Sequence, residues 1–213
     1  MLKLSLIMST IVLTLPLLVF AHGKGSGGIQ AKSDPSILAP FDIIHAKITT
    51  KGNVATFHMG ISGKAGISIP TATGKLAGSE VFSYVWPTSI DSYEVGFEKK
   101  AGILALAVTS HPDFDDTPLY DENGDGDRSN DGNLWHSHWV VLQPNEQCGK
   151  GALGVVDIPE GTTPRLPKTW PGLPILLDSP GWSPTLNTDT IEVQVPFNNI
   201  AVVESASFDG VTA

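Results

Sequence analysis

Residues 41–61 read FDIIHAKITTKGNVATFHMGI, two runs in which apolar and polar side chains alternate on either side of Lys51-Gly52. Alternation with a period of two is the pattern of a half-buried strand, and a turn pair between two such runs is typical of a hairpin. One face of this hairpin is apolar and consists of Ile44, Ala46, Ile48, Ala55, Phe57 and Met59. The stretch therefore predicts an antiparallel β-hairpin that packs one face on a core.

The position of the turn decides which side chains oppose each other across the hairpin. A two-residue turn at Lys51-Gly52 pairs His45 with His58, with Cβ atoms about 5 Å apart. A turn shifted by one residue, to Gly52-Asn53, would oppose His58 to Lys47 instead. We predict the first register, which makes the two histidines candidate metal ligands; a solvated pair on an exposed face is the alternative.

Further strands are expected wherever short apolar or alternating runs lie between glycine, proline and Ser/Thr/Asn clusters. The predicted strands are 81–86, 92–97, 103–109, 134–142, 153–158, 190–195 and 201–208. Gly102 to Val108 is almost continuously apolar, as in a central strand covered on both faces. The proline-rich segment 164–184 is expected to be an ordered loop across one end. With no sustained helical period, the sequence predicts an all-β fold, a single antiparallel β-sandwich, immunoglobulin-like or similar.

The first residues have the form of a secretory signal. Lys3 precedes an apolar run from Leu4 to Phe20, and Ala21 offers a cleavage site. We predict a signal peptide over 1–21, a flexible segment over 22–40 and one β-sandwich domain over 41–213, in a periplasm or outside the cell. An uncleaved anchor is the alternative, because the run is only slightly shorter than the roughly twenty residues of a membrane span.

Cleavage after Ala21 would make His22 the first residue. A free α-amine and an imidazole on one residue can chelate a metal, so His22 locally resembles the histidine-first copper sites of lytic polysaccharide monooxygenases and of some periplasmic copper carriers. The resemblance covers this one residue, which leads into the flexible GKGSGG.

Charge and cysteine content narrow the possible partners. Without Lys3, 12 basic residues face 22 acidic ones, a formal charge of −10 that disfavours nucleic acid and anionic membranes. Cys148 is the single cysteine, so no intramolecular disulfide is possible. Stability must come from the core, to which bound metal can add.

A long acidic loop lies between His111 and Gly132, with seven aspartates and Glu122 against the single Arg128. Its centre, DENGDGD, matches the first half of the calcium pattern D-x-[DN]-x-[DN]-G, whose alternate oxygen side chains surround a hard cation. The twelfth position is Gly132 rather than Glu, so the EF-hand resemblance stops halfway. The predicted calcium ligands are Asp121, Asn123, Asp125, Asp127 and Asp131, and the Asp113, Asp115 and Asp116 group can complete the shell. A merely solvated acidic turn is the alternative.

Histidines stand at both ends of this loop. His136 and His138 are two apart at a strand start, so they project from one face. His111 ends the preceding strand, and pairing of the two strands would bring it towards them. We predict a copper or zinc site of His111, His136 and His138, with His45, His58 or His22 as a fourth ligand. Simple packing of these rings against Trp135 and Trp139 is the alternative.

The sequence thus predicts a secreted or periplasmic protein that binds, carries or sequesters copper or zinc and has a structural calcium loop. One alternative is a calcium-dependent carbohydrate- or surface-binding module with a tryptophan platform. Its candidate residues are Trp86, Trp135, Trp139, Trp170 and Trp182. The other alternative is a metal-dependent enzyme, a zinc hydrolase or a copper oxygenase, that uses the same histidines. Other catalytic patterns, such as G-x-S-x-G and H-E-x-x-H, are missing from the sequence.

Overall fold

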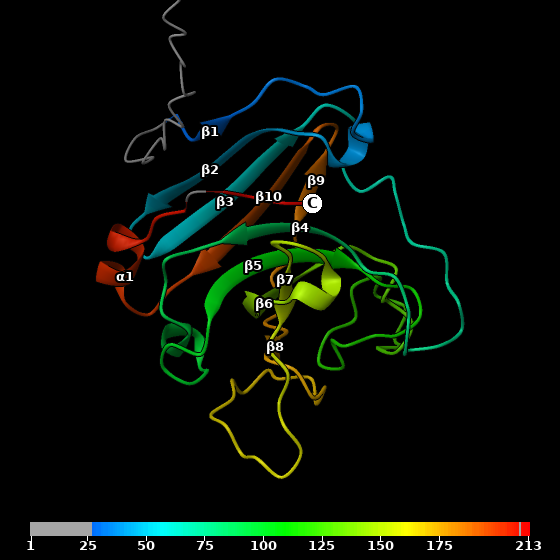
Figure 1. The fold of residues 1–213 in the computed structure, drawn as a ribbon, viewed down its shortest axis with the longest axis vertical. Coiled ribbons are helices and arrows are strands. Elements are labelled where there is room, and N and C mark those ends of the chain that lie inside the picture. The colour runs from blue at the N-terminus through cyan, green and yellow to red at the C-terminus, as the bar shows by residue number, and fades with distance from the viewer. Residues whose placement is uncertain (1–26, 209) are drawn as a thin grey trace, which may run out of the picture.

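The computed structural model describes residues 27–208 and 210–213, and in this part of the chain strands form two antiparallel sheets (Figure 1). The predicted signal peptide and His22 lie outside the described residues, as does the side chain of Cys148. The expected all-β class is confirmed. Among the described residues, no helix has both the length and the apolar character needed to cross a membrane.

The first sheet has the strand order β1-β2-β3-β10-β9. Its strands are β1 (Ile29–Gln30), β2 (Ile43–Lys51), β3 (Val54–Ile61), β10 (Thr190–Pro196) and β9 (Thr185–Asn187). The second sheet has the order β4-β5-β6-β7, and β8 also pairs with β6. Its strands are β4 (Phe82–Pro87), β5 (Ile103–Ser110), β6 (His136–Pro144), β7 (Leu153–Val155) and β8 (Leu177–Asp178). The described helices are η1 (Ala39–Phe41), η2 (Ser92–Val95), η3 (Glu146–Cys148) and α1 (Ile200–Ser205).

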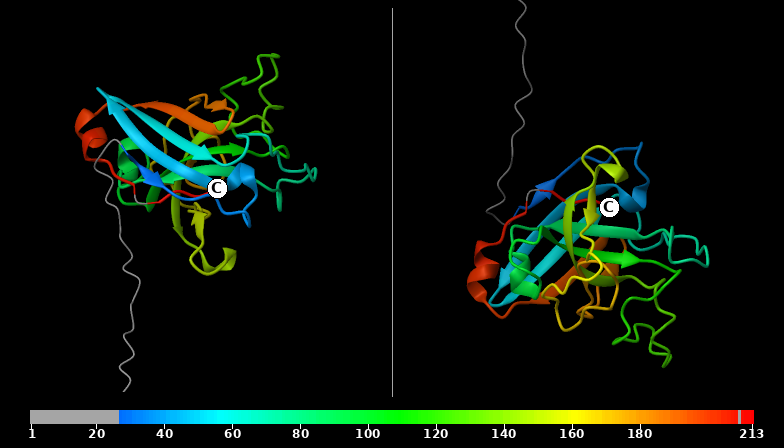
Figure 2. Two further views of the ribbon diagram at one scale, coloured as in Figure 1. Left: turned by 90° about the horizontal axis from the view of Figure 1, so that it is seen from above. Right: turned by 60° about the horizontal axis from the view of Figure 1, so that its bottom comes forward.

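The core lies between the two sheets. Phe57 on β3 packs edge-on against Trp86 on β4 and Trp139 on β6, with ring centroids 6.1 and 6.0 Å apart. Figure 2 shows the molecule from above and from below at an angle. The hairpin face predicted to be apolar supplies this core, since Ala46, Phe57 and Met59 are fully buried.

The other face of the second sheet is also covered. Ala105 and Ala107 on β5 pack with Val140 on β6 and Leu177 on β8. The apolar run 102–108 is therefore a central strand buried on both faces, as predicted. Leu177 belongs to the proline-rich segment, which runs mostly as a loop and adds the two-residue strand β8 beside β6.

The predicted register of the hairpin is wrong. The structure pairs Lys51 with Val54 and Lys47 with His58, so Gly52-Asn53 forms the turn. Gly52 is the first residue of this turn and has a positive φ of 59°. The first position of a type II′ turn requires such a φ and therefore favours glycine. The shift moves the pairing by two positions, so the apolar face is unchanged. The rings of His45 and His58 are diagonal neighbours, with centroids 5.4 Å apart.

Two predicted strands are helices. Residues 92–97 contain η2, because the carboxylate of Asp91 accepts the Tyr93 N–H and Gly96 ends the turn with a φ of 114°. Residues 201–208 contain part of α1, where the side chain of Asn199 accepts the Ala201 N–H. In both segments a side-chain cap outweighs the β propensity of the apolar residues. The short strands β1, β8 and β9 were not predicted.

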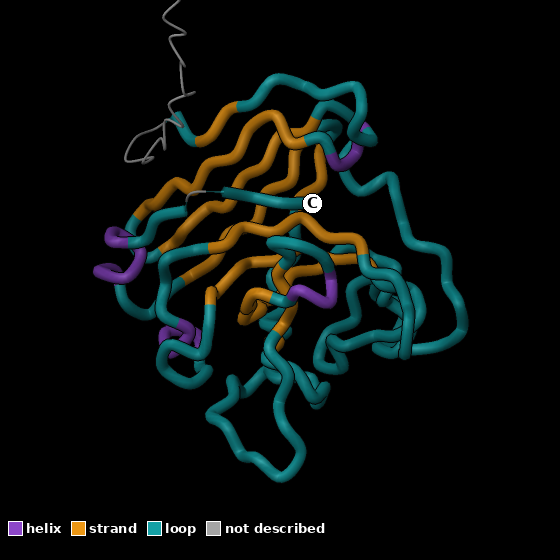
Figure 3. Tube along the Cα trace, in the orientation of Figure 1, coloured by secondary structure: helices purple, strands orange, loops and turns teal. Residues whose placement is uncertain are grey.

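Long loops join the strands at the end of the molecule opposite α1 (Figure 3). The loop 62–81 connects β3 to β4, and the acidic loop 111–135 connects β5 to β6. They are joined to each other, because the carboxylate of Asp113 accepts hydrogen bonds from the Thr73 N–H at 2.6 Å and the Thr73 hydroxyl at 3.1 Å. The acidic loop is thus anchored at its start before it reaches the tip.

Candidate metal centre

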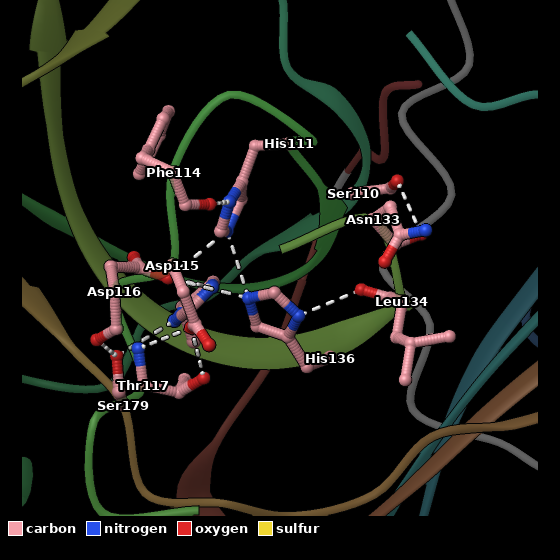
Figure 4. Close-up of polar contacts among 11 residues, drawn as sticks. Ser110, His111, Phe114, Asp115, Asp116, Thr117, Asn133, Leu134, His136 and Ser179 are labelled. Atoms are coloured by element: carbon pink, nitrogen blue, oxygen red, sulfur yellow. Dashed lines mark hydrogen bonds and ion pairs between the residues drawn. The ribbon is translucent and has the colours of Figure 1, made fainter. Parts of the chain in front are cut away.

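Pairing of β5 with β6 brings three histidines together. Thr109 is the partner of His136 and Ala107 is the partner of His138, so both histidines project from the face of β6 that points away from the first sheet. His111 follows β5 directly, and its Nε2 lies 2.8 Å from Nε2 of His136 (Figure 4). The loop closure inferred from the sequence is therefore present, and His111, His136 and His138 lie side by side.

Asp116 is the fourth member of the cluster. Its Oδ1 atom lies 3.0 Å from Nε2 of His111, 3.3 Å from Nε2 of His136 and 3.5 Å from Nε2 of His138. One ligand atom from each of the four residues lies within 4.8 Å of the other three. A buried cluster of three histidines and one aspartate is thus present, and it can hold a metal ion.

The second nitrogen of each ring faces an oxygen acceptor. Nδ1 of His111 lies 2.8 Å from the Phe114 carbonyl, and Nδ1 of His136 lies 2.7 Å from the Leu134 carbonyl. Nδ1 of His138 lies 3.1 Å from the Ser179 hydroxyl, which itself donates to the Asp116 carbonyl at 3.1 Å. Since these oxygens accept, each neutral ring carries its proton on Nδ1 and directs the Nε2 lone pair into the cluster.

The cluster is closed to solvent. The exposed fractions are 2% for His111, 3% for Asp116, 3% for His136 and 0% for His138. The acidic loop folds over one side through the hydrogen bond from the His111 N–H to the Gly132 carbonyl, 2.5 Å. The proline-rich segment covers the other side through Ser179. Histidines on an outer sheet face are therefore buried by two loops.

Burial and charge shift the pKa values of His111, Asp116 and His138 in different directions. Burial lowers the pKa of His138 to about 3, so its ring is neutral at ordinary pH. Burial also disfavours the charged form of His111, but the hydrogen bond and charge of Asp116 outweigh it and raise the pKa of His111 above its usual 6.5. Burial alone would raise the pKa of Asp116, yet the surrounding imidazoles hold it below the usual range.

The four groups fit a tetrahedral divalent cation. Ligand atoms about 2.05 Å from a tetrahedral metal are about 3.3 Å from one another. Four of the six separations are 2.8, 3.0, 3.3 and 3.5 Å and lie around that value, and the other two are within 4.8 Å. Nε2 of His138 is buried without any hydrogen-bond partner. A cation would satisfy this atom and separate the lone pairs of His111 and His136.

His45 and His58, two of the predicted histidines, do not join this cluster, and His22 lies outside the described residues. His45 and His58 lie in the first sheet, on β2 and β3. Nε2 of His45 is 3.2 Å from the Gly27 carbonyl, and Nδ1 of His58 is 3.6 Å from a carboxylate oxygen of Glu192. The fourth position expected of His45, His58 or His22 is taken in the structure by Asp116.

The centre of the acidic loop directs its oxygens to its own backbone. The Asp121 carboxylate accepts the N–H groups of Gly124, Asp125 and Gly126 at 2.7, 3.1 and 2.8 Å. Asp125 and Asp127 are exposed and accept further hydrogen bonds within the loop. Asn123 is also exposed and bonds to Asp125 and Asn130. Calcium at the predicted positions is therefore not shown.

Of the predicted calcium ligands, Asp131 lies elsewhere. It is fully buried and forms a second cluster with Asp115 and Glu122, whose ligand oxygens lie within 4.8 Å of one another. Burial raises the pKa of Glu122, and the charge of Asp115 adds to the increase while His136 opposes it. The two clusters are neighbours in the loop, since Asp115 precedes Asp116.

Scans of the chain against protein-family models, characterised proteins and solved structures found no match. The site is therefore interpreted from its geometry alone. Sequence reasoning missed Asp116 as a partner of the histidines, because it is one of seven similar aspartates in the loop. Its position five residues after His111 and directly before Thr117-Pro118 does not distinguish it.

Proposed function

We propose that this is a metal-binding protein in which His111, Asp116, His136 and His138 hold one divalent transition-metal ion. The observation that carries the proposal is the convergence of three Nε2 lone pairs and one carboxylate oxygen in a buried space, with every Nδ1 held by an oxygen. Three ring nitrogens and a carboxylate oxygen that face one another in a buried space need a cation, either a metal ion or a proton, between them.

Zinc is the metal that this ligand set favours over copper. Three imidazoles and a carboxylate at tetrahedral spacing suit zinc, whereas a soft sulfur ligand would favour Cu(I). Met59 does not offer such a sulfur, because it is fully buried on the core face of β3. The only support for copper that then remains is the hypothetical amine of His22.

Binding or sequestration is favoured over catalysis. A catalytic zinc site keeps one coordination position for water or substrate, whereas closed sites use four protein ligands. Here Asp116 supplies the fourth ligand, and none of the four is more than 3% exposed. A tryptophan platform for carbohydrate is disfavoured because Trp86, Trp135 and Trp139 are buried.

We further propose that the two sheets form one β-sandwich domain over 41–213, to which the preceding segment 22–40 adds the short edge strand β1. In this proposal residues 1–21 are a signal peptide and the protein acts in a periplasm or outside the cell. The apolar run after Lys3 supports export, and the acidic composition supports metal ions rather than nucleic acid as partners.

Metal analysis of the untagged protein tests the proposed centre. We expect about one zinc ion per chain by inductively coupled plasma mass spectrometry and a loss of at least tenfold in affinity for the double variant His136→Ala, His138→Ala. The matched control is His45→Ala, His58→Ala, which removes two histidines from the first sheet and should retain the metal. Equal binding by both double variants would refute the site.

Zinc affinity is expected to fall as the pH falls. Zinc must displace the proton from Nε2 of His111, whose pKa lies above 6.5. Below that pKa each unit of pH therefore weakens binding about tenfold for this one proton, while His138 stays neutral down to about pH 3. Competition with a chromophoric chelator between pH 8 and pH 5 measures the slope. A constant affinity over this range would contradict the assignment of His111 as a ligand.

A further inference from the structure

Three carboxylates lie close together beside the histidine centre with no positive group among them. Asp115, Glu122 and Asp131 each place one oxygen within 4.8 Å of the other two. Asp131 is 0% exposed and the other two side chains are partly buried. Three negative charges held together away from water repel each other strongly unless a cation or protons compensate them.

The hydrogen bonds of the cluster leave one oxygen free on each carboxylate. Oδ1 of Asp115 accepts the backbone N–H and the hydroxyl of Thr117 at 2.9 and 2.7 Å. Oδ2 of Asp131 accepts the Glu122 N–H at 2.9 Å. One oxygen of each carboxylate is buried without a hydrogen-bond partner: Oδ2 of Asp115, Oε2 of Glu122 and Oδ1 of Asp131.

The proximity of the three carboxylates is one indication of a bound ligand, and these unpaired oxygens are a second, independent one. Only six buried side-chain nitrogen or oxygen atoms lack a partner among the described residues; three of them belong to this cluster and a fourth is Nε2 of His138. Buried polar atoms are nearly always satisfied, so their concentration at two adjacent places needs a reason. A bound cation at each place supplies it.

We propose that Asp115, Glu122 and Asp131 form a second metal site, which takes a hard divalent cation of the calcium type. Calcium prefers oxygen ligands at 2.3–2.6 Å, so two oxygens on opposite sides of the ion are about 4.8 Å apart. The three carboxylate oxygens lie within 4.8 Å of one another and are therefore close enough to share one such ion. The site differs from the DENGDGD pattern, because only Asp131 was among the ligands predicted there.

The site ties the two ends of the acidic loop together. Asp115 lies near the loop's start, Glu122 before its tip and Asp131 at its return, so one ion would bridge three points of the loop. This proposal does not depend on the histidine centre, since it uses no histidine and a different class of metal.

Calcium titration of the zinc-loaded, untagged protein tests the proposal by isothermal calorimetry. We expect one calcium ion per chain, with a dissociation constant on the order of micromolar to submillimolar. The variant Glu122→Gln, Asp131→Asn should bind calcium at least about tenfold more weakly, with its zinc content unchanged. The matched control Asp125→Asn, Asp127→Asn removes two charges from the tip and should change the constant less than about threefold.

Two results would overturn the proposal. One is the absence of calcium binding to the wild type at millimolar calcium; the other is loss of binding in the tip variant with retention in Glu122→Gln, Asp131→Asn. The single variant Glu122→Gln provides the test if the double variant misfolds. It leaves Asp131 unchanged and keeps the hydrogen bond from the backbone N–H of residue 122 to the Asp131 carboxylate. Zinc is measured on the same samples so that the two proposals can be distinguished. Loss of zinc without loss of calcium binding would contradict only the proposal for the histidine centre.

Discussion

Removal of the transition metal is expected to lower the Tm of the protein by about 8–16 °C. An ion that binds only the native state adds RT ln(1 + [L]/Kd), about 4 kcal/mol when free metal exceeds Kd a thousandfold. For a domain of this size each kcal/mol corresponds to about 2–4 °C in Tm. Without the metal, Nε2 of His111 and Nε2 of His136 face each other at 2.8 Å, so one of the two rings must carry a proton there in place of the metal.

Differential scanning calorimetry with and without a nitrogen-donor chelator measures this shift. Such a chelator prefers zinc to calcium, so the carboxylate cluster is left untouched. The His136→Ala, His138→Ala variant is the control, since it has no metal to lose and its Tm should not respond. A wild-type Tm that stays constant on chelation, in protein shown to release its zinc, would contradict a stabilising role for the centre.

Local sequence patterns correctly predicted the strands and side-chain faces that depend only on neighbouring residues. The strands β3, β5 and β10 have clear alternating or apolar runs, and their positions were predicted closely. His136 and His138 were placed on one face because β6 is a strand. The errors lie where a single side chain or glycine decides the structure, as with the caps of η2 and α1 and the turn at Gly52.

The composition of the site depends on contacts between distant residues. Ser179 fixes the ring of His138 from a position 41 residues away in the sequence. The path of the loop determines that Asp116 and Asp131, among several similar aspartates, reach the two clusters. That path cannot be predicted from a residue pattern. The calcium motif illustrates the same dependence on the path of the loop. Spacing indicates which oxygens can converge, but in the structure the Asp121 carboxylate accepts hydrogen bonds from the backbone of its own turn.

Substitution of Gly132 by alanine is expected to disrupt the loop that closes both clusters. A Cβ atom at Gly132 would overlap the carbonyl oxygens of Phe114 and His111. The first of these oxygens holds Nδ1 of His111, and the Gly132 carbonyl accepts the His111 N–H. Relief of the overlap must therefore move His111 or its ring, which breaks the alignment of its Nε2 with Asp116.

We expect Gly132→Ala to reduce the free energy of unfolding by about 2–4 kcal/mol, because backbone oxygens cannot move as a flexible side chain can. Zinc affinity should fall about 10–100-fold, the usual effect of losing a group that orients a ligand. The control is Gly27→Ala, since Gly27 is exposed and an added Cβ would meet nothing within 4 Å. Urea denaturation and chelator competition measure the two effects. Wild-type stability together with wild-type zinc affinity in Gly132→Ala would show that the loop does not hold His111 in place.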